Sequence, residues 1–244
     1  MPVFTLATLF VRLFFTFPTD NQIPVFTLAT SLVILIFSFC VIKRSSNYLL
    51  PYLPPLFANA RPICGKMANS PLVSYTKLSP NHSGRRVCQI SRITPHAVVG
   101  QLSVERICGC FAGKDRQASC NYAIGADGRI GLCVDEQNRS WCSSSRDNDQ
   151  RAITIECASD LIEPYAMKLE VYSALVELCT DICRRNGKRK LVWISDRDKA
   201  FAYSVRSDEM LLAVHRWFAR KSCPGNWLME RLGCLAQEVN SRLG

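Results

Sequence analysis

From residue 90 onward, the sequence alternates between strand patterns and helix patterns. Strand patterns cover residues 90–99, 152–158 and 191–194, and helix patterns cover residues 102–111, 165–186 and 225–243. Such alternation is typical of a sheet with helices packed on its faces. The sequence therefore predicts an α/β domain built on a single mixed β-sheet flanked by helices.

Local signals refine this prediction. The pair Asp127-Gly128 divides two apolar runs within residues 121–134, which predicts a β-hairpin because Asp-Gly adopts the backbone angles of a tight turn. Apolar residues recur at three- and four-residue spacing across residues 165–186, which predicts the longest helix. We expect a long polar loop at residues 195–209, and a break near Gly233 in the last helix.

Composition and charge limit the class of protein. The chain has 244 residues, of which 48% are hydrophobic and 20% are charged, which excludes disordered, collagenous and coiled-coil proteins. The net charge is +10, which favours anionic partners such as nucleic acid, anionic lipid or a wall that carries teichoic acid. Because the surplus is spread over both parts of the chain, no segment has the concentrated basic character of a nucleic-acid-binding surface. We expect no nucleic-acid partner.

The first 66 residues differ from the rest of the chain. Residues 24–42 form an uncharged segment that is long enough for a transmembrane helix. Lys43 and Arg44 follow it directly, as basic residues commonly do at the end of such a helix, so the segment predicts a single-pass membrane protein. The heptamer PVFTLAT occurs twice, at residues 2–8 and 24–30, which instead indicates a non-native extension upstream of a start at Met67. Both interpretations divide the chain into a hydrophobic leader, 1–66, and a catalytic domain, 67–244.

Three residues have the character of a catalytic metal site. His96 lies in an expected strand, and His215 precedes Cys223 by eight residues in a late loop. Two histidines and one cysteine, with a fourth position open to water, are the ligand plan of a catalytic zinc. The spacing alone leaves an alternative open, in which these residues are two core histidines and a buried thiol.

Four segments resemble the type 2 N-acetylmuramoyl-L-alanine amidases, especially their phage endolysin and clostridial forms. They are ITPHAVVGQLSVE, SCNYAIGADGRIGLCVDEQNRSWCSSS, NDQRAITIECAS and VHRWFARKSCPG, and they occur in this order between residues 93 and 225. The resemblance implies the fold shared by peptidoglycan recognition proteins and phage lysozyme-type amidases. It also implies an enzyme of cell wall degradation, which hydrolyses the amide bond between N-acetylmuramic acid and L-alanine in peptidoglycan.

The resemblance also implies roles for individual residues. His96, His215 and Cys223 fall on the family's zinc ligands, so Zn²⁺ is the expected cofactor and the muropeptide is the expected partner. Lys221 falls on the lysine that stabilises negative charge on the substrate oxygen. Glu156 falls on the acid of the central strand, where general acid-base catalysis requires a proton acceptor and donor.

One position departs from the family pattern. Some family members have a catalytic tyrosine where this chain has Cys120, so Glu156 is expected to transfer the proton and Tyr122 is a minor catalytic candidate. The alternative function is a non-catalytic module that recognises peptidoglycan without hydrolysing it. In either case we expect the protein to act at the cell wall, whether secreted, released or anchored in the membrane.

Overall fold

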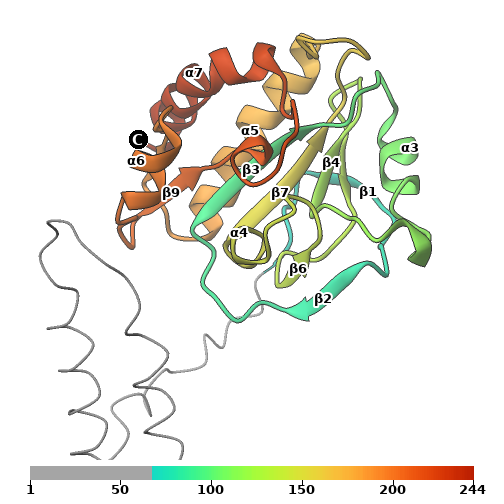
Figure 1. The fold of residues 1–244 in the computed structure, drawn as a ribbon, viewed down its shortest axis with the longest axis horizontal. Helices are drawn as coiled ribbons and strands as arrows, with labels where there is room; N and C mark the ends of the chain where they lie inside the picture. Colours follow the sequence, from blue (N-terminus) through green and yellow to red (C-terminus); the bar gives the residue numbers. More distant parts are fainter. Residues whose placement is uncertain (1–67) are drawn as a thin grey trace, which may run out of the picture. The chain divides into compact units, whose positions relative to one another are not determined.

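The protein is described by a computed structural model, which defines residues 68–244; the predicted leader and the predicted start at Met67 lie outside this range. The described residues form a seven-stranded sheet (Figure 1). In spatial order its strands are β1 (Val73–Thr76), β5 (Ile130–Leu132), β4 (Tyr122–Ile124), β7 (Ala152–Cys157), β3 (Arg92–Ala97), β9 (Glu209–Leu212) and β8 (Lys190–Val192). Within this sheet, only the pair β4 and β5 is antiparallel, and all other neighbouring strands are parallel. The predicted mixed α/β fold is confirmed.

Helices and a small ribbon complete the described domain. The helices are α3 (Val104–Gly109), α4 (Arg146–Arg151), α5 (Leu169–Arg185), α6 (Arg197–Ala202) and α7 (Asn226–Leu243), with 3-10 turns η1 (Lys114–Arg116) and η2 (His215–Trp217). Strands β2 (His82–Arg85) and β6 (Asn138–Ser140) form a separate antiparallel ribbon. In Figure 1, α5 and α7 lie together on one side of the sheet, and α3 lies near β1 and β4.

The alternation of side chains along the strands gives the sheet two different faces. Glu156 pairs with His96 on one side and with Ala123 on the other, so these three residues share a face. Tyr122 pairs with Ile155 and shares the opposite face, which α5 covers. The buried side of α5 includes Val171, Leu175, Leu178 and Ile182, the apolar positions that the periodicity of residues 165–186 predicts.

The predicted hairpin is confirmed at β4 and β5. Gly128 has a φ of +80°, and a side chain there would meet the backbone oxygen of Glu170 at 2.9 Å. Asp127 closes the turn by accepting a hydrogen bond from the backbone N–H of Arg129 at 3.1 Å. A glycine is therefore required here both by the turn and by the close approach of α5.

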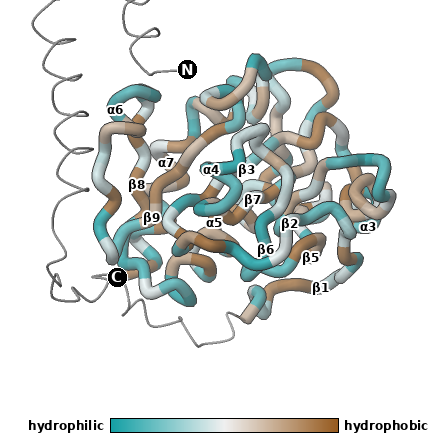
Figure 2. The backbone as a smooth tube through the Cα atoms, turned by 60° about the horizontal axis from the view of Figure 1, so that its bottom comes forward, coloured by the Kyte–Doolittle hydropathy of each residue, from teal (hydrophilic) through white to brown (hydrophobic). Residues whose placement is uncertain are grey.

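The predicted loop at residues 195–209 is wrong, because it contains α6 and the first residue of β9. The Asp196 side chain begins α6 by accepting a hydrogen bond from the backbone N–H of Lys199 at 2.8 Å. Helix α6 buries only Ala200, so it lacks the apolar period by which a helix is recognised. In Figure 2 the tube changes from teal to tan along α6 and is mostly brown along β9.

The predicted break near Gly233 is also wrong, because α7 runs unbroken from Asn226 to Leu243. A glycine inside a helix costs about 1 kcal/mol relative to alanine. Five buried residues on one side of α7 offset this cost, namely Leu228, Leu232, Leu235, Ala236 and Val239. A Cβ atom at Gly233 would lie 3.8 Å from the Trp193 ring, an ordinary van der Waals contact, so packing does not require a glycine at this position.

The transmembrane prediction requires correction. Within residues 68–244, every helix is too short or too polar to cross a membrane. The segment on which the prediction was based, residues 24–42, lies outside the described residues.

Candidate active site and metal centre

The site begins where two neighbouring parallel strands end. His96 in β3 and Glu156 in β7 are direct cross-strand partners, each one residue before the end of its strand. In parallel sheets, ligands bind beyond the carboxyl ends of the strands. The register of β3 and β7 therefore places an imidazole beside a carboxylate at the edge where a site is expected.

His215 and Cys223 come to this edge from the segment that follows β9. Strand β9 pairs parallel with β3, so η2, which begins at His215, lies near His96. The centroids of the two imidazole rings are 5.0 Å apart, and the Sγ atom of Cys223 lies 3.4 Å from Nδ1 of His96. One ligand atom from each of these three residues lies within 4.8 Å of the other two.

The geometry of these three side chains fits a zinc ion. With Zn–N bonds of about 2.1 Å and Zn–S bonds of about 2.3 Å at tetrahedral angles, ligand atoms are separated by about 3.5 Å. The distance of 3.4 Å between His96 Nδ1 and Cys223 Sγ agrees with this value. Burial, and then the nearby His215, lower the pKa of His96 to about 3, so its imidazole is neutral at physiological pH, as a metal ligand must be.

The two carboxylate oxygens of Glu156 have different surroundings. Oε1 accepts a hydrogen bond from the Cys142 thiol at 3.7 Å, whereas Oε2 is buried and has no partner among the described residues. Burial raises the pKa of Glu156 from 4.5 to about 7. A carboxylate with a free oxygen and a pKa near neutrality can both accept and return a proton.

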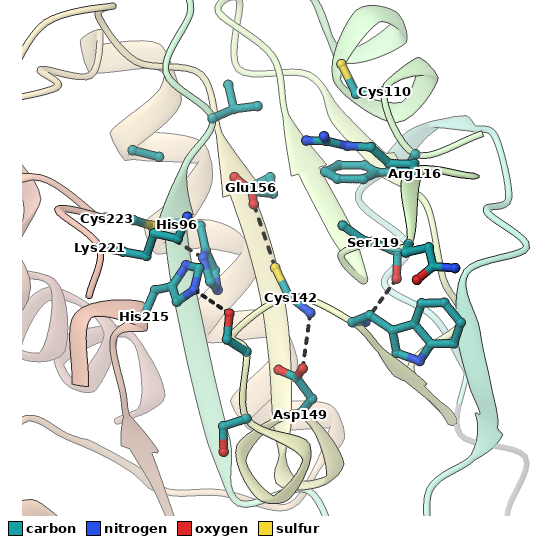
Figure 3. Close-up of a pocket in the computed structure, with 18 of the residues that line it drawn as sticks. His96, Cys110, Arg116, Ser119, Cys142, Asp149, Glu156, His215, Lys221 and Cys223 are labelled. Atoms are coloured by element: carbon teal, nitrogen blue, oxygen red, sulfur yellow. Dashed lines mark hydrogen bonds between the residues drawn. The ribbon is translucent and has the colours of Figure 1, made fainter. Parts of the chain in front are cut away.

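These residues line a cleft with a volume of about 700 Å³ (Figure 3). Lys221 is exposed at the cleft and lies close enough to His215 to contribute to the lowered pKa of that histidine, after the larger effect of burial. Figure 3 shows His96, His215, Lys221 and Cys223 on one side of the cleft and Arg116 on the other, with Glu156 between them. The structure thus brings together five of the six residues that the sequence indicated.

Tyr122, the minor catalytic candidate, is the exception. Tyr122 pairs with Ile155, the residue before Glu156 in β7. Because successive residues of a strand point to opposite faces, the side chain of Tyr122 lies on the opposite face of the sheet from Glu156. The hydroxyl of Tyr122 donates to the buried carboxylate of Glu136 at 2.5 Å and accepts from the backbone N–H of Ser70 at 2.8 Å. These contacts stabilise the fold and place Tyr122 outside the residues that line the cleft.

Three further residues of the cleft, Cys142, Ser144 and Asp149, were not predicted from the sequence. Cys142 contacts Glu156, and Asp149 holds the segment of Cys142 by accepting hydrogen bonds from the backbone N–H groups of Cys142 and Ser143, each at 3.1 Å. Ser144 lies 3.1 Å from Nε2 of His215. The only sequence signal for Cys142 and Ser144 was their position in the block NRSWCSSS, because residues of an irregular connection have no period to reveal their direction.

A family model described as N-acetylmuramoyl-L-alanine amidase matches residues 81–226 of the chain. This range contains His96, Glu156, His215, Lys221 and Cys223. Among curated proteins, none matches the chain.

Several solved structures are similar at low sequence identity. PlyL has 15% identity and a TM-score of 0.47, over 68% of this chain and 95% of PlyL. A mutant endolysin from Bacillus subtilis has 12% identity and a TM-score of 0.46, over 68% of this chain and 97% of its own. The endolysin amidase LysCS from Clostridium intestinale has 15% identity and a TM-score of 0.40, over 70% of this chain and 96% of its own.

Proposed function

The chain belongs to the N-acetylmuramoyl-L-alanine amidase family, and from that premise we propose that it is a zinc-dependent hydrolase of peptidoglycan. The bond cleaved is the amide between the lactyl group of N-acetylmuramic acid and the L-alanine of the stem peptide. We assign catalysis to the domain 67–244, within which the family match falls.

One observation carries this proposal. The ligand atoms of His96, His215 and Cys223 converge to within 4.8 Å of one another in a cleft that Glu156 and Lys221 also line. We assign the three converging residues as ligands of Zn²⁺. A bound zinc supplies a Lewis acid for the amide carbonyl and lowers the pKa of a water molecule toward about 7.

Glu156 carries the proton transfer in this proposal. Its unpartnered oxygen, Oε2, accepts the proton of the attacking water, and the resulting carboxylic acid returns it to the departing amine of L-alanine. The contact from Cys142 to Oε1 leaves Oε2 free for this task. A group that donates and accepts in turn needs a pKa near the working pH, and burial gives Glu156 a pKa of about 7.

Lys221 acts on the substrate carbonyl. Attack on the amide places negative charge on its oxygen, and a nearby ammonium group opposes that charge most strongly where water is excluded. Lys221 lies beside the proposed ligand His215, so its charge is directed at the same part of the cleft.

Product analysis tests the proposed bond. Purified full-length protein is incubated with peptidoglycan, and new amino termini and new reducing sugar ends are measured after dialysis against a chelator and after addition of Zn²⁺. We expect new amino-terminal alanine, no new reducing ends, loss of activity on chelation and recovery with Zn²⁺. Binding to peptidoglycan without any new termini would instead identify a non-catalytic recognition module.

A further inference from the structure

A second group of potential ligands lies beside the proposed zinc site. His96, Cys142 and Glu156 each offer one ligand atom, and these atoms lie within 4.8 Å of one another. This group shares only His96 with the group of His96, His215 and Cys223. In Figure 3 the Cys142 thiol points toward the carboxylate of Glu156, from the segment that also carries the contact to Asp149.

Hydrogen bonds from the backbone at Cys142 and Ser143 to Asp149 hold the Cys142 thiol in this position. Asp149, which is only 3% exposed, accepts the N–H of Cys142 through Oδ2, and it accepts both the N–H and the hydroxyl of Ser143 through Oδ1. Asp149 therefore fixes the backbone at the N–H of Cys142 and at the N–H of the next residue, Ser143. A thiol and a carboxylate on fixed backbone are positioned ligands rather than mobile surface groups.

Two buried atoms of this group also lack partners. Nε2 of His96 and Oε2 of Glu156 have no hydrogen-bond partner in the described part of the chain, and His96 is 1% exposed. A buried polar atom without a partner is energetically unfavourable. Proton transfer by Glu156 accounts for its own free oxygen, but it does not require a thiol 3.7 Å from the other oxygen of the same carboxylate.

We propose that His96, Cys142 and Glu156 form a second, inhibitory position for a soft divalent cation such as Zn²⁺. Thiolate and imidazole ligands favour such ions over Mg²⁺ or Ca²⁺. On binding, the Cys142 thiol and the remaining ring N–H of His96 both release their protons to solvent, so that a sulfur–metal bond forms and the His96 imidazolate holds one ion through each ring nitrogen, while Glu156 contributes a carboxylate oxygen. The thiolate and the carboxylate together balance the charge of the ion.

Inhibition follows from the use of Glu156 as a ligand. A carboxylate bound to a cation cannot accept the proton of the attacking water. Excess Zn²⁺ should therefore suppress the hydrolysis that the first equivalent supports. The inhibition rests on the proposed function, whereas the binding of a second ion does not.

A cobalt titration of the full-length protein tests the site. Metal-free protein is titrated with Co²⁺, and bound metal and thiolate-to-cobalt charge-transfer absorption are measured at each step. The wild type is compared with Cys142→Ser, which keeps a hydroxyl donor toward Glu156, and with Cys110→Ser, which removes an exposed thiol at the rim of the same cleft. In parallel, peptidoglycan hydrolysis is measured in excess Zn²⁺, relative to the activity of each protein with one equivalent.

We expect the wild type and Cys110→Ser to bind a second Co²⁺ with a further rise in thiolate absorption, and to lose hydrolysis in excess Zn²⁺. In Cys142→Ser, the second ion should bind at least about tenfold more weakly, without the further absorption, and inhibition should require correspondingly more Zn²⁺. A single cobalt site in the wild type, or equal inhibition of the wild type and Cys142→Ser, would overturn the proposal. Absence of hydrolysis at one equivalent would count against the proposed function, while the cobalt titration would still decide the second site.

Discussion

The Nδ1 atom of His96 and the Sγ atom of Cys223 lie 3.4 Å apart, although 127 residues separate them in the chain. The fold brings them together because β3 pairs with β9, and the chain leaves β9 directly into η2 and then reaches Cys223. On its other side β3 pairs with β7, which places Glu156 directly beside His96. The proposed site is therefore a product of the strand order β7-β3-β9.

Replacing Glu156 by Gln should abolish proton transfer without removing a ligand of the proposed catalytic zinc. We expect kcat to fall by about 10²–10⁴-fold, the contribution typical of general acid-base catalysis. Zinc content should stay at the wild-type value. Glu105→Gln, in a partly exposed residue of α3 that pairs with Arg129 and lies outside the cleft lining, is the matched control. A variant with wild-type kcat would exclude Glu156 as the proton acceptor.

Replacing Lys221 by Met should weaken stabilisation of the developing oxyanion. We expect kcat to fall by about 10²–10³-fold, as when one oxyanion donor is removed elsewhere, with a smaller change in KM. The neighbouring Arg220→Met removes a charge from an exposed residue outside the cleft lining and should have little effect. If the two variants lost activity equally, the effect would be one of overall charge rather than of position.

Tyr122→Phe should affect stability and not catalysis. The hydroxyl bonds Glu136 and the backbone N–H of Ser70 on the face away from the cleft. Loss of these bonds should lower the free energy of unfolding by about 1–3 kcal/mol, measured by urea denaturation. The value of kcat at a temperature where the variant is folded should match the wild type. A large loss of kcat under those conditions would return Tyr122 to the list of catalytic residues.

The raised pKa of Glu156 predicts a pH effect on the stability of the metal-free protein. Burial raises this pKa from 4.5 to about 7, so between these values the folded state keeps a proton that the unfolded state releases. This difference destabilises the wild type progressively as pH rises from 4.5 to 7, and glutamine has no proton to release. The stability of Glu156→Gln relative to wild type should therefore rise across this interval, by up to about 3 kcal/mol.

Urea denaturation in chelator at pH 4 and pH 8 measures this change. The lowered pKa of His96 is shared by both proteins, so it cancels in the comparison. A difference in stability that stays constant between the two pH values would show that Glu156 ionises normally in the folded state.

The sequence predicted the elements with strong periodicity, and it missed those without it. The hairpin at Asp127-Gly128 and the helix α5 carry clear turn and apolar signals, and the structure contains both. Strand β9 has four residues and follows a polar segment, so no alternation marks it. Without β9 the sequence offered no physical reason for His215 to approach His96, and the family resemblance supplied that expectation.

Tyr122 and Cys142 show a second limit. Whether Tyr122 shares a face with Glu156 depends on the register between β4 and β7, which the sequence of either strand leaves open. Cys142 lies in an irregular segment whose direction is set by hydrogen bonds to Asp149. The direction of such a segment is a tertiary property.

The proposed hydrolysis depends most directly on zinc bound through Cys223. The measurement is zinc content and dye-labelled peptidoglycan release by the full-length protein, beside Cys223→Ser and the control Cys234→Ser in an exposed residue of α7. In buffer without added zinc, we predict one firmly held zinc and rapid release for the wild type and the control, and loss of both for Cys223→Ser. Hydrolysis by zinc-free protein, or wild-type zinc content and release in Cys223→Ser, would contradict the account.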